Sequence, residues 1–91
     1  MKKLFVNTQT QECGMYDPSD LDDNWIEAPN GTQAVYYLKA HGIFLYYKVQ
    51  KGILKICTEN NIWTDSILIV SEINNSLLTV HLWGTLQDFD L

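Results

Sequence analysis

Short apolar runs separated by turn residues dominate the chain from residue 33 onward. The turn signals are His41-Gly42, Lys51-Gly52, Asn60-Asn61 and Asn74-Asn75. Glycine and asparagine tolerate positive φ angles, so these dipeptides favour short hairpins. The spacing predicts a mainly β fold, a small antiparallel meander that forms either a sheet or a partly open barrel.

A two-residue period is clearest in residues 43–50. One face carries Ile43, Leu45, Tyr47 and Val49, and the other carries Phe44, Tyr46, Lys48 and Gln50. Residues 78–83 alternate in the same way, which predicts His81 and Trp83 on one face of a strand. Residues 66–70 are apolar at almost every position, which is typical of a central strand covered on both sides.

Residues 33–41 allow two interpretations. Thr32 and Gly42 are suited to cap the two ends of a short helix. Val35, Tyr36 and Tyr37 favour a strand instead, because β-branched and aromatic residues are poor helix formers. A strand keeps the fold mainly β, whereas a helix makes it α+β.

The amino-terminal third contains fewer regular signals. Residues 2–9 predict an opening strand, and residues 28–32 predict a turn. A helical turn is expected to begin at Pro18 with Asp17 as its cap, inside a loop over residues 16–25. The tail, residues 86–91, is expected to form an edge strand whose aspartates discourage further strand pairing.

A chain of 91 residues fits one domain, residues 1–91. Hydrophobic residues make up 46%, which is globular rather than disordered. A domain of this size has a thin stability margin, and association with a second copy is one remedy, so we expect a homo-oligomer.

The net charge of −5 changes the range of partners. All six basic residues are lysine, and arginine, which grips phosphate and guanine with a planar fork, is missing. An acidic chain repels the phosphate backbone, so we expect no direct nucleic-acid binding. A protein with a basic surface is the partner that the charge favours.

The cysteine and apolar content predicts a cytoplasmic protein that does not enter a membrane. Cys13 and Cys57 match no zinc or redox spacing and are expected as reduced thiols. The amino terminus has two lysines but only three apolar residues before polar ones resume, which is too short for a secretion signal. Usage rich in Asn, Ile and Lys points to an AT-rich genome, such as that of a bacterium or phage.

No motif brings two catalytic groups together, so we expect neither an enzyme nor a cofactor. His41 lies at a predicted turn and His81 on the expected solvent face of a strand. Cys57 is expected as a small buried hydrophobe, and Cys13 as an exposed thiol.

One acidic cluster, with Asp20, Asp22 and Asp23 next to Trp25, is a candidate for function. Calcium uses closely spaced oxygen ligands, but Trp25 stands where a calcium loop needs glycine, so we expect no metal site. A solvated loop is the plain interpretation. The alternative is a protein-contact surface, because tryptophan beside charge is typical of binding hot spots.

Adjacent tyrosines occur twice, at residues 36–37 and 46–47, on strands predicted to pair. Such pairs stabilise a hairpin through cross-strand aromatic contacts. They also qualify Tyr36 and Tyr46 as residues of an aromatic patch that contacts a partner or a second copy.

Two functional hypotheses follow. The first is a non-catalytic protein-interaction module, such as a small acidic accessory or inhibitor protein. The second starts from the hairpins after residue 33, whose strand spacing resembles the second half of small lipocalin-like domains, although the chain is too short for eight strands. That resemblance implies a small barrel with an apolar ligand in a cavity lined by Leu45, Tyr47, Ile56 and Val80.

Overall fold

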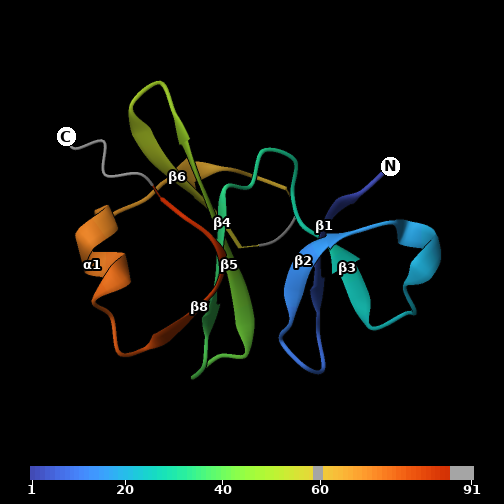
Figure 1. The fold of residues 1–91 in the computed structure, drawn as a ribbon. Helices are drawn as coiled ribbons and strands as arrows, with labels where there is room; N and C mark the ends of the chain where they lie inside the picture. Colours follow the sequence, from blue (N-terminus) through green and yellow to red (C-terminus); the bar gives the residue numbers. More distant parts are fainter. Residues whose placement is uncertain (59–60, 87–91) are drawn as a thin grey trace.

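Two antiparallel sheets make up most of the fold in this computed structural model, which describes residues 1–58 and 61–86 (Figure 1). The smaller sheet has the order β2-β1-β3 and contains β1 (Lys3–Asn7), β2 (Cys13–Tyr16) and β3 (Trp25–Glu27). The larger sheet has the order β7-β6-β5-β4-β8 and contains β4 (Ala34–Leu38), β5 (Ile43–Gln50), β6 (Ile53–Cys57), β7 (Thr64–Asp65) and β8 (Thr79–Gly84). A 3-10 turn, η1 (Pro18–Asp20), and a short helix, α1 (Val70–Asn74), complete the elements of the described residues. The predicted mainly β, antiparallel class is confirmed.

The hairpins β4–β5 and β5–β6 form the predicted meander. Residues 34–38 are a strand, not a helix, and pair with β5 from Ala34 opposite Tyr47 to Leu38 opposite Ile43. Gln50 pairs with Ile53 across the Lys51-Gly52 turn, in which both residues have positive φ angles of 55° and 75°. Two positive φ angles define the hairpin turn that matches the twist of the strands.

The chain leaves the meander through residues 66–78, which we call the return segment. β8 pairs with β4 instead of β7, so the return segment carries the chain across one face of the larger sheet (Figure 1). The predicted central strand at residues 66–70 is therefore wrong, because α1 begins at Val70. The Glu72 carboxylate accepts a hydrogen bond from the Ile69 backbone N–H at 2.9 Å, which fixes the first helical turn.

The predicted hairpin turn at Asn74-Asn75 is also wrong. Asn74 ends α1, and the N–H of Asn75 donates to the Ser71 carbonyl as the helix cap. Asparagine serves both kinds of chain reversal, so the dipeptide alone does not separate them.

A β-bulge changes the side of the sheet to which side chains of β8 point. The register with β4 shifts between Val35 and Tyr36, so that Trp83 lies opposite Val35 and His81 opposite Tyr36. Trp83 packs toward the smaller sheet, whereas the His81 ring lies 5.1 Å from the Tyr36 ring on the other side. The prediction that His81 and Trp83 share a face is wrong, because a bulge adds one residue to a strict two-residue period.

The larger sheet separates two cores and gives the molecule three layers (Figure 1). The helix-side core, under the return segment, contains Ala34, Tyr36, Leu45, Tyr47, Leu54, Ile73 and Leu86. The sheet-side core, against the smaller sheet, contains Val6, Ala28, Val35, Phe44, Tyr46 and Cys57. The predicted alternation along residues 43–50 is confirmed, since neighbouring residues enter opposite cores.

The amino-terminal predictions hold in part. The opening strand is β1, the helical turn is η1 with Asp17 as its cap, and Thr32 donates to the Pro29 carbonyl at 3.2 Å in the predicted turn. β2 and β3, which pair with β1, were not predicted. The edge strand expected at residues 86–91 lies outside the described residues apart from Leu86, and so does Asn60 of the predicted Asn60-Asn61 turn.

Candidate functional site

The acidic loop, residues 17–25, is held in shape by its own hydrogen bonds. Asp17 Oδ1 accepts from the backbone N–H and the hydroxyl of Ser19, at 3.0 and 2.9 Å. These bonds lower the pKa of the Asp17 carboxyl. Asp22 Oδ1 accepts from the backbone N–H of Asn24 at 2.9 Å. The loop therefore has a defined conformation in which Asp17 and Asp22 act as local caps.

Three aspartates of the acidic loop point into solvent. Asp20, Asp22 and Asp23 are all exposed. Within the part of the chain that the structure describes, the ion pairs join Asp17 to the amino terminus, Lys3 to Glu27 and Lys55 to Asp65. The three exposed carboxylates thus face water without a lysine partner among the described residues.

Trp25 closes the acidic loop at the start of β3. Its ring is half-buried and meets the Tyr16 ring edge-on, with centroids 4.9 Å apart. The Trp25 backbone N–H donates to the Asp22 carbonyl at 3.3 Å, so the tryptophan and the acidic residues belong to one local structure. Trp25 anchors the loop and still offers part of its ring to solvent.

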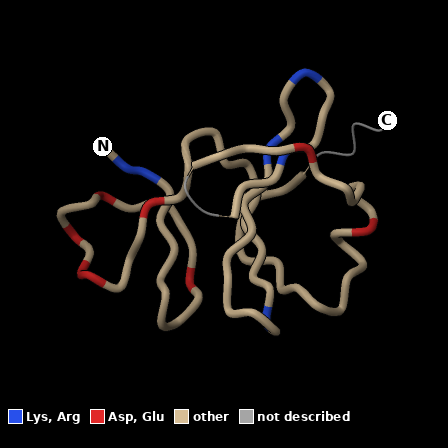
Figure 2. Tube along the Cα trace, turned by 180° about the vertical axis from the view of Figure 1, so that it is seen from behind, with Lys and Arg blue, Asp and Glu red and all other residues tan. Residues whose placement is uncertain are grey.

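Acidic residues concentrate at the end of the molecule that carries the smaller sheet. Figure 2 shows most of the acidic positions there, whereas lysines mark the amino terminus and the β5–β6 hairpin. The acidic residues of this end are Glu12, Asp17, Asp20, Asp22, Asp23 and Glu27. The electrostatic potential at the acidic loop is therefore more negative than it would be if the net charge of −5 were distributed evenly over the surface.

Tyr36 and Tyr46 lie in the cores. Their exposed fractions are 3% and 4%, which leaves almost no ring surface for a partner. Tyr36 meets Tyr47 edge-on at 5.6 Å, and burial raises the pKa of Tyr46 to about 12. Aromatic packing within the sheet accounts for both tyrosines, so we leave them out of the contact surface.

Cys13, Cys57 and His81 were expected to take no part in catalysis. Cys57 is buried, as predicted. Cys13 is half-buried rather than exposed, and burial raises the pKa of its thiol to about 11, so it stays protonated at neutral pH. No disulfide joins the two cysteines.

A ring nitrogen of His81 contacts the Gly84 carbonyl. Residues 1–58 and 61–86 hold no group of three potential metal ligands.

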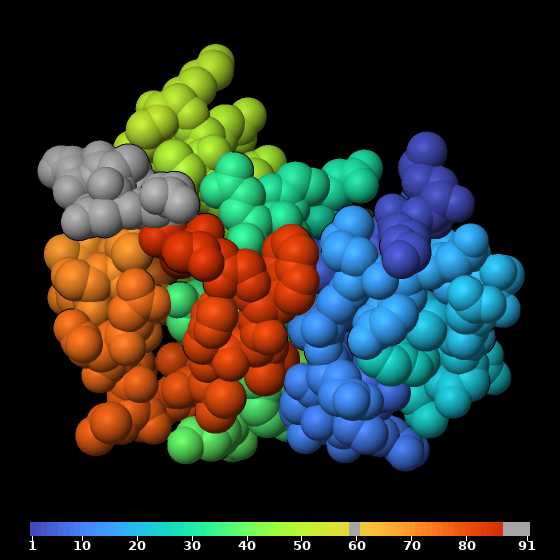
Figure 3. All heavy atoms as spheres, in the orientation of Figure 1, coloured from blue at the N-terminus to red at the C-terminus, as the bar shows by residue number. Residues whose placement is uncertain are grey.

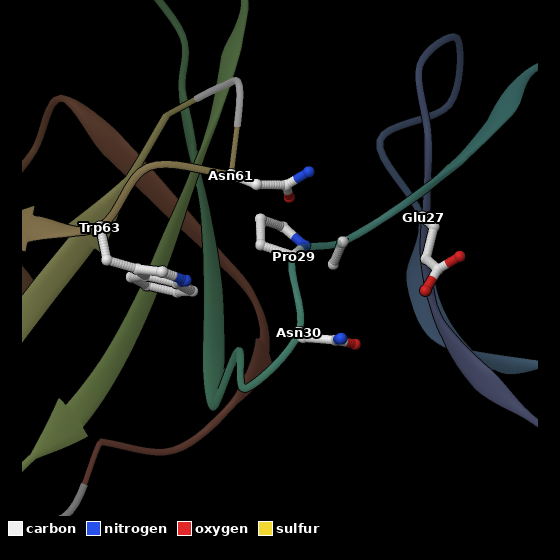
Figure 4. Close-up of a pocket in the computed structure, with 6 residues that line it drawn as sticks. Glu27, Pro29, Asn30, Asn61 and Trp63 are labelled. Carbon is white, nitrogen blue, oxygen red and sulfur yellow. The ribbon is translucent and has the colours of Figure 1, made fainter.

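A polar cleft of about 410 Å³ lies where the link from β3 to β4 approaches the segment after β6. Figure 4 shows Trp63 and Asn61 on one side, Pro29 and Asn30 opposite them, and Glu27 further away. The Lys48 ammonium lies 4.5 Å from the centre of the Trp63 ring, a cation–π contact. The cleft was not predicted, because it joins residues more than 30 positions apart.

An apolar groove of about 400 Å³ lies between the larger sheet and the return segment. Its lining includes Leu38, Leu45, Tyr47 and Ile56 from the sheet, with Leu68 and Ile73 from the return segment. Figure 3 shows the orange return segment separated from the red β8 strand, with green atoms of the sheet between them. Leu45, Tyr47 and Ile56, three of the four residues expected to line a ligand cavity, line this groove. The fourth, Val80, pairs with Tyr37 and lies outside the lining.

No known protein family, characterised protein or solved structure matches the chain. Within the described ranges, no helix has both the length and the apolar character needed to cross a membrane.

Proposed function

We propose that this protein is a non-catalytic protein-interaction module whose acidic loop binds a basic surface of another protein. The observation that carries this proposal is a trio of exposed aspartates, Asp20, Asp22 and Asp23, on a loop already ordered by its own hydrogen bonds. A preordered loop loses little conformational entropy on binding. Its negative potential increases the rate of encounter with a basic partner.

Trp25 supplies the apolar part of the proposed contact. Its half-buried ring is fixed against Tyr16, so binding does not have to order a flexible side chain. Fixed aromatic residues ringed by polar groups are typical of the few positions that dominate binding free energy. The contact surface therefore consists of Asp20, Asp22, Asp23 and the exposed part of Trp25.

The experiment is affinity isolation from an extract of the source cells with a charge-neutralised loop. The variant D20N/D22N/D23N removes three negative charges, and the amide oxygen introduced by Asp22→Asn still caps Asn24. A matched control, A40K/Q50K/T85K, changes the net charge equally at exposed positions in β5, in the turn after β4 and directly after β8. Wild type and control are expected to retain one basic protein in stoichiometric amount, and the loop variant to lose it.

Two results contradict the proposal. Retention of the same protein by D20N/D22N/D23N excludes the acidic loop as the contact. Equal loss from the control means that net charge alone, and not this loop, determines the association.

A second candidate function is the binding of an apolar ligand in the apolar groove. Its support is the lining by Leu45, Tyr47 and Ile56 and a volume within the range of about 300–1,000 Å³ seen for small-molecule sites. We favour the interaction module, because a small molecule in the groove leaves Leu77, which is 90% exposed and outside the groove lining, in water.

The proposal extends to the cellular location of the protein and to the kind of organism it comes from. A cytoplasmic location fits two cysteines without a disulfide, because a reducing compartment keeps thiols reduced. A small accessory or inhibitor protein of a bacterium or phage fits a short acidic chain free of arginine.

A further inference from the structure

The return segment places large apolar side chains in water. Ile67 is 97% exposed, Leu77 90%, Leu78 65% and Ile69 63%. A single exposed leucine is ordinary in a folded protein, but neighbouring apolar side chains at this exposure mark a surface that another molecule covers.

These apolar side chains lie next to the apolar groove. Ile67 and Leu78 form part of the rim of the apolar groove, whose floor is the sheet face with Leu45 and Ile56. One patch thus carries both protruding apolar side chains and a groove that accepts apolar side chains. A patch that is complementary to itself is what a twofold symmetric dimer requires.

Charge favours a second copy as the occupant. The groove lining contains one charged residue, Asp65, which is paired with Lys55. From residue 66 to residue 79 the sequence has one more, Glu72, whose carboxylate is engaged in the first turn of α1. The acidic loop lies at the other end of a molecule 39 Å long (Figures 1 and 2). Two copies joined at the return segments keep their acidic loops several Debye lengths apart, since this length is about 8 Å at physiological salt. A basic partner, by contrast, is attracted to the acidic loop.

We propose that the apolar groove and the return segment form the interface of a homodimer, in which Ile67 and Leu77 of each protomer pack against the groove of the other. The interface hides the exposed apolar side chains of both protomers at once. It also adds apolar contact to a chain with a small core.

Sedimentation velocity over a concentration series tests this interface. For wild type we expect the mass to rise from 10.5 kDa toward twice that value between about 1 and about 300 μM. I67D/L77D is expected to weaken association at least about 100-fold, because each side chain is a central apolar contact. Both side chains are exposed in one protomer, so we expect the variant to keep its fold, and circular dichroism checks this.

The control is Ile62→Asp, which adds a carboxylate at an isoleucine that is 64% exposed and outside the lining of the groove. It is expected to associate like wild type, as is D20N/D22N/D23N, so the dimer and the partner contact are tested separately. A monomeric wild type over the whole series overturns the proposal. Association of I67D/L77D at wild-type strength also overturns it.

Discussion

The Tyr36 hydroxyl in β4 donates a hydrogen bond to Oδ1 of Asn74 at the end of α1, 38 residues later in the chain. Tyr36 is 3% exposed, so its hydroxyl depends on this acceptor. Ile73, next to Asn74, is buried in the helix-side core. The pair therefore fixes α1 on the larger sheet and holds one wall of the apolar groove.

The first prediction concerns this pair. Tyr36→Phe removes the hydroxyl and keeps the ring, and it is expected to lower the free energy of unfolding by about 1 kcal/mol. Asn74→Ala is expected to add little to Tyr36→Phe, because the two changes remove one bond. Urea denaturation of both single variants and the double variant measures the coupling, and strictly additive losses contradict the role of this bond.

The second prediction concerns Gly84 at the end of β8. Its φ angle is +77°, and a Cβ atom there meets the Gln33 carbonyl oxygen at 2.1 Å. Gly84→Ala is expected to cost about 3 kcal/mol, the sum of backbone strain and overlap. Gly52→Ala is the matched control, since Gly52 has a φ angle of +75° with nothing within 4 Å, and its expected cost is about 1 kcal/mol. Equal midpoints of thermal unfolding for the two variants contradict the close approach of Gly84 to β4.

The third prediction concerns alkaline pH. Burial raises the pKa of Cys13 from 9.0 to about 11, and that of Tyr46 and Tyr47 from 10.0 to about 12. The unfolded chain loses these protons first as pH rises, so it binds fewer protons than the folded chain and stability falls. The stabilising contribution is complete below pH 9 and is lost by about pH 12.

Urea midpoints at several pH values measure this decline. Tyr46→Phe removes one titrating group from the sheet-side core and keeps the ring, so its stability is expected to fall less between about pH 9 and about pH 12. The same decline in Tyr46→Phe and wild type shows that Tyr46 is not protected from ionisation in the folded chain.

The fourth prediction separates the two proposed surfaces by salt. Raising the salt concentration from about 0.05 to about 0.5 M is expected to weaken binding of the basic partner at least tenfold, because exposed charges are screened. Dimerisation through the apolar groove is expected to persist, since salt does not weaken apolar burial. Titrations at both salt concentrations distinguish the surfaces, and an insensitive partner complex is evidence against an electrostatic contact.

The meander was predictable because its determinants are local. The alternation along residues 43–50 and the Lys51-Gly52 turn fix β5 and the β5–β6 hairpin without distant contacts. The strand predicted at residues 66–70 was wrong because a run that is apolar on both faces has no periodicity that separates a strand from a helix. The one helix signal, Glu72 three residues after Ile69, lies beyond that run.

The candidate surfaces were predictable to different degrees. Aspartates 20, 22 and 23 are exposed, as their local sequence suggested, because a run of acidic residues between turn signals is rarely buried. The sequence predicts Tyr36 and Tyr46 as contact residues, but Tyr36 is buried in the helix-side core under the return segment and Tyr46 in the core against the smaller sheet. The apolar groove depends on the path of the return segment, which periodicity did not reveal.

The central claim is that the acidic loop binds another protein, and native mass spectrometry of the chain gently isolated from its source tests it most directly. We expect a complex whose mass exceeds whole multiples of the 10.5 kDa chain by that of one further protein, and its loss in D20N/D22N/D23N but not in A40K/Q50K/T85K. A spectrum of wild type that shows the chain with no other protein, or a complex that survives in D20N/D22N/D23N, contradicts the claim.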